Sequence, residues 1–159
     1  MIKLNIWAKV MIGISVCLMV GFISGLSTQE SLQSWYANLE KPSFNPPNWI
    51  FAPVWTVLYA LMGISAGLIW DAGWKNKPVQ NAIMLFLAQL ILNATWSVVF
   101  FGTQSPIAAL VIILALLILI WLCMRRLRPI NRWATVLLLP YFLWVSFATI
   151  LNASIVYLN

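Results

Sequence analysis

The sequence contains no histidine and only three acidic residues among 159. Histidine is the commonest protein ligand for zinc, copper and haem iron, and buried carboxylates build most proton relays in membranes. None of the three carboxylates falls in the middle of an apolar run, so we expect no metal site, no cofactor and no catalytic acid–base pair. Cys17 and Cys123 lie in different apolar runs, so the sequence predicts neither a disulfide nor a redox site.

Charged residues are also scarce: they make up 8% of the chain, whereas 63% of it is hydrophobic. That leaves too little polar surface to cover a soluble domain and indicates a bilayer. A helix needs about 20 mostly apolar residues to cross the hydrocarbon core, and the alternating pattern of a membrane barrel is absent. We predict an all-α membrane protein, a single domain over residues 1–159 built as a five-transmembrane-helix bundle. The predicted helices are 6–26, 49–70, 79–101, 106–124 and 133–157.

The first apolar run could also begin a secretion signal, because Lys3 and Lys9 precede it. It continues for about 17 residues after Lys9, longer than the apolar core of such a signal, and no A-x-A cleavage site follows. We interpret it as a retained membrane helix.

The cations predict how the chain is oriented. Five crossings place the N-terminus and the loops near residues 71–78 and 125–132 on one side, together with every Lys and Arg except Lys41. Short loops rich in Lys and Arg stay in the cytoplasm. We therefore expect a cytoplasmic N-terminus and an external C-terminus. This interpretation of the +6 charge is preferred to binding of nucleic acid or anionic lipid by the basic segment 125–128.

Tryptophan, in contrast, is abundant, with ten residues. Trp and Tyr gather at membrane interfaces, which accounts for most of them. Three fall inside predicted helices, at depths of about 8–20 Å from the outer boundary at ~1.5 Å per residue. Residues four apart share a helix face, and each of these tryptophans belongs to a row that mixes aromatic, amide and small side chains. The rows are Trp55, Tyr59 and Gly63; Gln89, Asn93 and Trp96; and Trp144, Ala148 and Asn152.

Faces of this kind suit a cavity with aromatic walls and a few hydrogen-bond donors. We predict that the three rows line one ligand pocket open to the outside; the alternative is that they only pack helices together. The glycine pairs Gly21–Gly25 and Gly63–Gly67 are predicted to pack helices closely, within the bundle or between protomers. Pro140 is predicted to bend the fifth helix one turn before Trp144.

The connection 27–48 is long for so small a protein. Residues 31–39 have the apolar spacing of a short amphipathic helix, and Pro46 and Pro47 suit the start of the next helix, where a missing N–H costs nothing. We predict a lid over the outer-facing pocket, with an irregular loop as the alternative.

Four motifs resemble, in order and spacing, those of the translocator protein family, also called tryptophan-rich sensory proteins or TspO/MBR. The similarity covers about residues 35–152. The motifs are WYANLEKPSFNPP at 35–47, PVWTVLY at 53–59, QLILNATW at 89–96 followed by FFG at 100–102, and PYFLWVSFATILN at 140–152.

The resemblance implies a five-helix bundle, usually a homodimer, that binds porphyrins such as protoporphyrin IX or another hydrophobic small molecule. Its role would be in tetrapyrrole transport, sensing or regulation, with the ligand in a pocket on the side of the first loop. The ligand-binding residues implied are Trp55, Tyr59, Asn93, Trp96, Trp144, Ala148 and Asn152, and the lid residues are Trp35, Lys41 and Pro42.

Two other functions stay open. Some members are associated with light-dependent porphyrin degradation, for which the resemblance implies Trp55 and Trp144 as catalytic residues; the third alternative is a structural or regulatory partner without a ligand. The chain departs from the family where Phe44 and Ala109 replace tryptophans. Its last residues, VYLN, lack the cation of a weak sterol pattern. This argues against sterol binding, and the charge asymmetry favours a bacterial inner membrane over a mitochondrial one.

Overall fold

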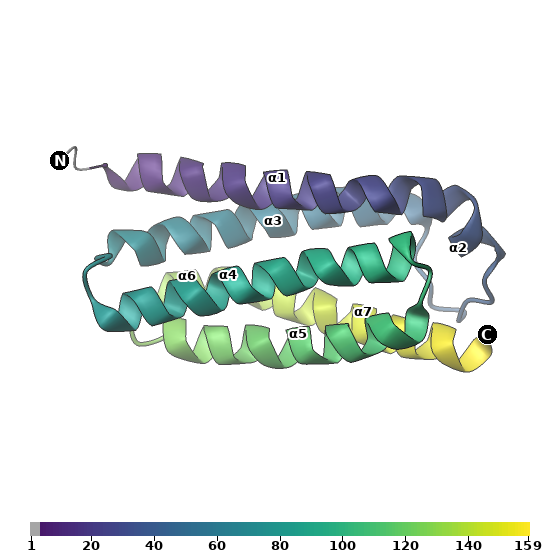
Figure 1. The fold of residues 1–159 in the computed structure, drawn as a ribbon. Coiled ribbons are helices and arrows are strands. Elements are labelled where there is room, and N and C mark those ends of the chain that lie inside the picture. Colours follow the sequence, from purple (N-terminus) through teal and green to yellow (C-terminus); the bar gives the residue numbers. More distant parts are fainter. Residues whose placement is uncertain (1–3) are drawn as a thin grey trace.

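A computed structural model describes residues 4–159, so Lys3 lies outside the described residues. The chain forms a bundle of long helices (Figure 1), and no strand occurs between residues 4 and 159. The prediction of an all-α membrane protein is confirmed. The elements are α1 (Ile6–Gln33), α2 (Trp35–Asn38), α3 (Asn48–Asp71), α4 (Lys77–Ser97), η1 (Val98–Gly102), α5 (Pro106–Leu127), α6 (Arg132–Leu137) and α7 (Leu139–Leu158).

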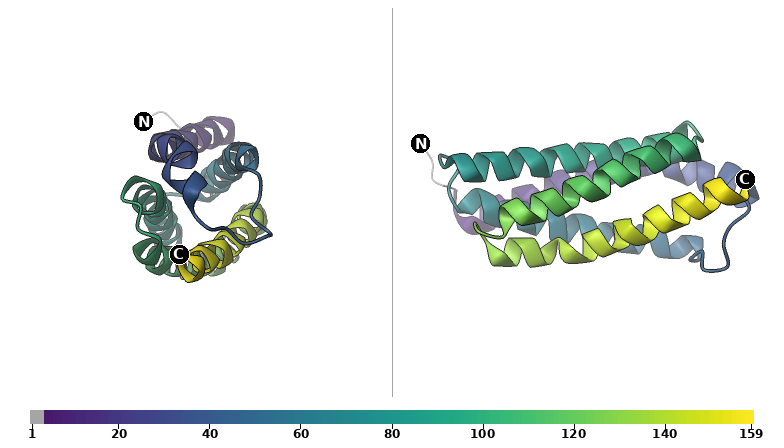
Figure 2. Two further views of the ribbon diagram at one scale, coloured as in Figure 1. Left: turned by 90° about the vertical axis from the view of Figure 1, so that its right-hand side faces the viewer. Right: turned by 90° about the horizontal axis from the view of Figure 1, so that it is seen from below.

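Five segments are long and apolar enough to cross a membrane, and they coincide with the five predicted helices. They are Ile6–Leu26, Asn48–Asp71, Lys77–Gly102, Pro106–Leu127 and Arg132–Leu158. Seen end-on in Figure 2, the helices form a closed ring. In this ring α1 packs on α3, α3 on α6, α7 on α5, α5 on α4, and α4 again on α1.

Small residues bring α1 and α3 together at the N-terminal end of the ring. A Cβ added to Gly63 would lie 2.3 Å from the Cα of Ile14, and one added to Gly67 would lie 2.5 Å from the Cα of Val10. The backbone of Gly13 faces Gly63 from the other side. Helices can approach this closely only where side chains are absent. The predicted packing role of Gly63 and Gly67 is confirmed, and it operates within the bundle.

Three features of the helices bear on the sequence prediction. α1 continues to Gln33 instead of ending at residue 26, because the hydroxyl of Ser31 is buried and donates to the carbonyl of Phe101. Residues 27–33 of the predicted lid therefore belong to α1. The amphipathic helix expected over residues 31–39 is reduced to the four residues of α2. The fifth helix is interrupted at Leu138, two residues before Pro140, and Pro140 lies in the first turn of α7, where its missing N–H breaks no bond.

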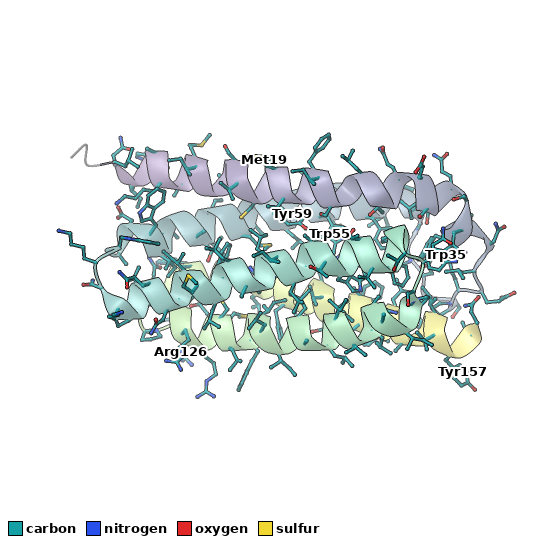
Figure 3. All side chains as sticks on the ribbon, in the orientation of Figure 1. Met19, Trp35, Trp55, Tyr59, Arg126 and Tyr157 are labelled. Atoms are coloured by element: carbon teal, nitrogen blue, oxygen red, sulfur yellow. The ribbon has the colours of Figure 1, made fainter. Side chains whose placement is uncertain are left out.

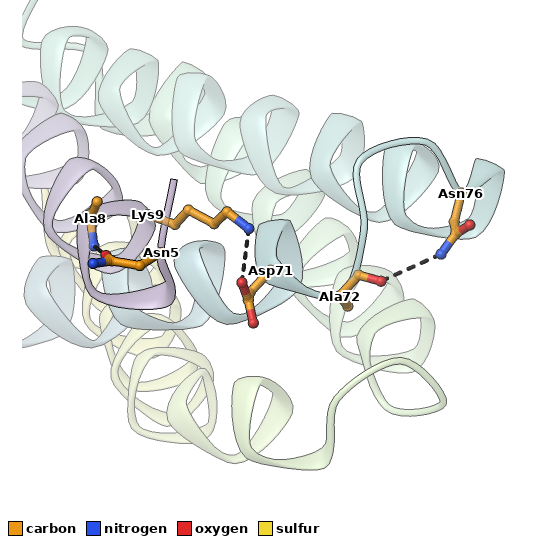
Figure 4. A network of polar contacts seen from close by, with 6 residues as sticks. All are labelled: Asn5, Ala8, Lys9, Asp71, Ala72 and Asn76. Atoms are coloured by element: carbon orange, nitrogen blue, oxygen red, sulfur yellow. Dashed lines mark hydrogen bonds and ion pairs between the residues drawn. The ribbon is translucent and has the colours of Figure 1, made fainter. Parts of the chain in front are cut away.

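The N-terminal end of the bundle carries the excess positive charge. The α3–α4 and α5–α6 connections lie at this end (Figure 1), with Lys75 and Lys77 beside the first and the Arg125–Arg132 segment at the second. The single ion pair among residues 4–159 also lies here: Lys9 Nζ is 2.8 Å from Asp71 Oδ1 (Figure 4). It joins the first turn of α1 to the last turn of α3.

Gly63 provides a test of the α1–α3 contact. Gly63→Ala places a methyl group against the backbone of Ile14, so α1 must move away, and overpacking of this kind costs about 1–3 kcal/mol. We expect a clear fall in the melting temperature of the detergent-solubilised protein. Gly25→Ala is the matched control on α1, because its added Cβ meets no atom within 4 Å. Equal melting temperatures for the two variants would contradict the packing assigned to Gly63.

Candidate ligand cavity

A cavity of about 470 Å³ lies between α1, α3 and α4, in the half of the bundle nearer to α2. This volume falls within the roughly 300–1,000 Å³ typical of small-molecule sites. Its walls combine aromatic rings, aliphatic side chains, hydroxyls and amides. The lining residues are Leu18, Gly21, Phe22, Ser24, Gly25, Leu26, Thr28, Gln29, Leu32, Asn48, Phe51, Ala52, Trp55, Thr56, Tyr59, Asn93, Trp96, Ser97 and Phe101.

Trp55 is at the centre of the aromatic wall. Its ring centroid lies 5.7 Å from that of Tyr59, one turn further along α3, and 6.4 Å from that of Trp96 on α4. It also meets Tyr141 of α7 edge-on at 6.4 Å. Figure 3 shows Trp55 and Tyr59 inside the bundle, between α1 and α4. Trp96 is held in turn by stacking on Phe100 at 5.6 Å.

Side-chain amides orient these rings. Asn93 Nδ2 donates to the hydroxyl of Tyr59 at 3.1 Å, and Trp96 Nε1 donates to Asn152 Oδ1 at 3.2 Å. Asn152 also donates through Nδ2 to the carbonyl of Pro106 at 2.9 Å. These three bonds join α3 to α4, α4 to α7 and α7 to α5. The amides therefore both pack the helices and hold the rings that line the cavity, which unites the two alternatives of the sequence analysis.

The α7 row lines a second, smaller space of about 30 Å³. Trp144, Ala148 and Asn152 border it, and Trp55 and Trp96 separate it from the main cavity. It is small because aromatic rings fill this side: Trp144 packs against Phe51 at 6.2 Å and Phe147 at 5.5 Å. The structure thus brings the seven predicted ligand-binding residues around Trp55 and Trp96 but divides them between two spaces.

Two members of the predicted rows lie outside both spaces. Gly63 belongs to the α1–α3 contact, and Gln89 is 1% exposed within the core. Three buried polar groups have no hydrogen-bond partner among residues 4–159: the Gln89 amide, the Tyr141 hydroxyl and Trp144 Nε1. Of these residues, Trp144 borders the smaller space. Its indole N–H is buried beside that space.

α1 also contributes to the cavity, which was not expected from the sequence pattern. Gly21, Ser24, Gly25 and Thr28 line the main cavity, and Gly21 makes room for the ring of Tyr59. The signal was present, because these residues recur with the i, i+3, i+4, i+7 spacing of one helix face. The G-x-x-x-G spacing of Gly21 and Gly25 predicts a helix-packing pair. A Cβ on Gly25 would meet nothing within 4 Å, so Gly25 borders open space instead.

The segment predicted as a lid crosses the α2 end of the bundle (Figure 2). Trp35 packs edge-on against Phe100 at 5.6 Å, and Lys41 Nζ donates to the carbonyls of Tyr36, Ala37 and Leu39 at 2.8–3.1 Å. The carbonyl of Pro42 accepts from the backbone of Asn45 at 3.0 Å. Trp35, Lys41 and Pro42 border neither cavity.

Tyr36 anchors the lid segment. It is 2% exposed, and its hydroxyl donates to Asn45 Oδ1 at 2.8 Å. Burial raises the pKa of Tyr36 to about 12, although the bond to Asn45 lowers it, so the hydroxyl keeps its proton at neutral pH. Asn159 adds a second attachment, accepting from the backbone N–H of Glu40 at 3.0 Å and donating to its carbonyl at 3.1 Å.

The chemistry of the lining is stacking and hydrogen bonding. None of the described residues that border either cavity is acidic, basic or a cysteine. Within residues 4–159 there is also no cluster of metal-binding side chains. The lining offers indole and amide donors, hydroxyls and aromatic faces, which suit recognition of a flat, largely apolar molecule.

Comparisons with known proteins agree with the motifs. The profile of the TspO/MBR family matches residues 13–158. The tryptophan-rich protein TspO of Chlorobaculum tepidum is 45% identical, over 92% of each chain. That of Archaeoglobus fulgidus is 44% identical, over 95% of this chain and 97% of its own. The human translocator protein is 38% identical, over 74% of this chain and 70% of its own.

Asn152 tests whether the amides hold the rings. Asn152→Leu removes its bonds to Trp96 and to the Pro106 carbonyl, and we expect a loss of about 1–2 kcal/mol, since single side-chain bonds between membrane helices contribute about 0.6 kcal/mol and an unpaired donor costs more. The measurement is thermal unfolding in detergent. Ser154→Ala is the control, because that hydroxyl bonds only within α7. An unchanged melting temperature for Asn152→Leu would refute the role given to these bonds.

Proposed function

The chain belongs to the TspO/MBR family of multi-pass membrane proteins, and from this premise we propose that it binds a porphyrin of the protoporphyrin IX type in the main cavity. Its role would lie in transport, sensing or regulation of tetrapyrroles. The observation that carries the proposal is the wall of Trp55, Tyr59 and Trp96, with ring centroids 5.7–6.4 Å from Trp55. Such rings offer extended π-surfaces on which a macrocycle can stack.

The polar lining supports the same ligand class. A porphyrin carries carboxylates at one edge, and these need hydrogen-bond donors near the membrane surface. Gln29 and Asn48 border the cavity near the α2 end and are exposed. Lys41, the one cation at this end, is already bonded to three carbonyls. We therefore assign the carboxylate contacts to amide and hydroxyl groups rather than to Lys41.

Binding is favoured over catalysis because the cavity holds no group that would exchange protons near neutral pH. Light-dependent degradation is a second candidate, supported by the ring contacts of Trp55 with Trp96 and Tyr141. Illumination of the bound complex tests it. A bilin-like absorbance that requires Trp55 supports degradation, whereas bleaching equal to that of free porphyrin opposes it.

Titration in the dark tests binding. We expect protoporphyrin IX to quench the tryptophan fluorescence saturably, and Trp55→Ala to weaken binding about tenfold or more, equivalent to about 1.4 kcal/mol, because Trp55 borders both spaces. Trp144→Ala, which affects only the smaller space, should weaken it less.

Trp133→Ala is the matched control, since Trp133 is 73% exposed and borders neither cavity. Wild-type protein without saturable quenching would refute porphyrin binding and favour a structural or regulatory partner. Equal affinities for all three variants would refute this site.

We also propose that the N-terminus lies in the cytoplasm, in a bacterial inner membrane. The supporting observation is that Lys and Arg residues gather at the N-terminal end, whereas Lys41 is alone at the α2 end. The homodimer stays a prediction from the resemblance. The glycines do not point to its interface, because Gly13, Gly63 and Gly67 are used inside the bundle.

Cysteine labelling tests the orientation. Ser43 and Ala72 are exposed at opposite ends of the bundle, and both native cysteines are buried. In intact cells, a membrane-impermeant maleimide should label Ser43→Cys and leave Ala72→Cys unlabelled until the membrane is opened. The reverse pattern would invert the proposed topology.

A further inference from the structure

The exposed residues that line the main cavity all lie on two helices, α1 and α3. Among its lining residues on α4 and η1, Asn93, Trp96 and Phe101 are at most 9% exposed and Ser97 is half-buried. The six exposed residues define the α1–α3 portal: Phe22, Leu26 and Gln29 on α1, and Asn48, Ala52 and Thr56 on α3.

Hydroxyl groups close the opposite seam, between α1 and α4. The hydroxyls of Thr28 and Ser97 lie 3.0 Å apart, and Ser97 donates to the carbonyl of Ser24 at 3.2 Å. One turn further along α1, the hydroxyl of Ser31 donates to the carbonyl of Phe101. α1 is thus attached to α4 and η1 beside the cavity, from Ser24 to Ser31.

The water-facing end is closed by the lid segment. Tyr36 is buried and bonded to Asn45, Lys41 caps the carbonyls at the end of α2, and Asn159 bonds to both backbone groups of Glu40. A ligand coming from water would have to break these contacts. The portal requires no hydrogen bond to break.

The portal lies at the depth of the acyl chains. α3 begins at Asn48, and Thr56 lies eight residues further, about 12 Å along the helix at ~1.5 Å per residue. One leaflet contributes about half of the roughly 30 Å hydrocarbon core. The opening therefore extends from the interface, where Gln29 and Asn48 lie, through most of the leaflet at the α2 end.

We infer that the ligand enters sideways from this leaflet, through the α1–α3 portal, and that the lid segment stays closed. This inference rests on the proposed function. The ligand class it selects is a flat ring system dissolved in the membrane, with one polar edge that stays level with the amides of Gln29 and Asn48. The rings enter first, between Leu26 and Ala52, and reach Trp55.

Stopped-flow kinetics test the route. The protein is reconstituted in phosphatidylcholine vesicles and mixed with protoporphyrin IX, and fluorescence quenching gives kon, koff and Kd. Ala52→Trp narrows the portal from α3, and Leu26→Trp narrows it from α1 should the first variant fold poorly. A barrier on the route slows binding and release alike, so we expect both rates to fall about tenfold while Kd changes by less than about threefold.

Val57→Trp is the matched control, because Val57 follows Thr56, is 58% exposed and borders neither cavity. It should bind at the wild-type rate. Asn45→Ala loosens the lid by removing the acceptor of Tyr36, and it should leave kon unchanged.

Three results would overturn the portal. The first is a faster kon in Asn45→Ala with wild-type rates in Ala52→Trp, which assigns the route to the lid. The second is a change of koff and Kd in Ala52→Trp or Leu26→Trp while kon stays at the wild-type value. The new side chain would then act on the bound ligand and not on its route. The third is wild-type protein without saturable quenching, which refutes the proposed function and the portal with it.

Discussion

The close contact between α1 and α3 sets the geometry of the half of the bundle that lies nearer to α2. At Gly13, Gly63 and Gly67 the two backbones touch, because any Cβ there would collide with the opposing helix. At Gly21 the ring of Tyr59 lies between α1 and α3. On the α2 side of this ring, the residues of the two helices line the main cavity. The cavity thus lies next to a tight contact of the kind that small residues allow between membrane helices.

The polar side chains inside the bundle serve the same geometry. In hydrocarbon an unpaired amide is costly, so Asn93 and Asn152 must find partners, and the partners they find are Tyr59 and Trp96. Each bond fixes an aromatic ring that would otherwise rotate into the empty space. The hydroxyls of Thr28 and Ser97 act likewise between α1 and α4. A cavity of about 470 Å³ can persist because its walls are bonded to one another rather than to a ligand.

The fold was readable from the sequence because helix length in a membrane is dictated by the thickness of the bilayer. The rows through Trp55, Asn93 and Asn152 were also readable, since residues four apart share a face whatever their surroundings. The partition into two spaces was not, because it depends on how the rings of Phe51 and Phe147 pack around Trp144. The role of Gly25 could not be predicted for a related reason. A G-x-x-x-G pattern is the same in the sequence whether a neighbouring helix or an empty space faces the glycines.

The distribution of bonds over the molecule argues for access from the membrane. Hydrogen bonds at the α2 end hold the lid segment, and hydroxyls hold the α1–α4 seam, whereas the rim of the portal is half apolar and no hydrogen bond among the described residues joins its two helices there. Acyl chains are fluid and give way to an apolar solute without loss of hydrogen bonds. The porphyrin proposed as the ligand is largely apolar and would reach the protein from that phase. The lowest barrier to the wall of Trp55 is therefore the side that the chain leaves to the bilayer.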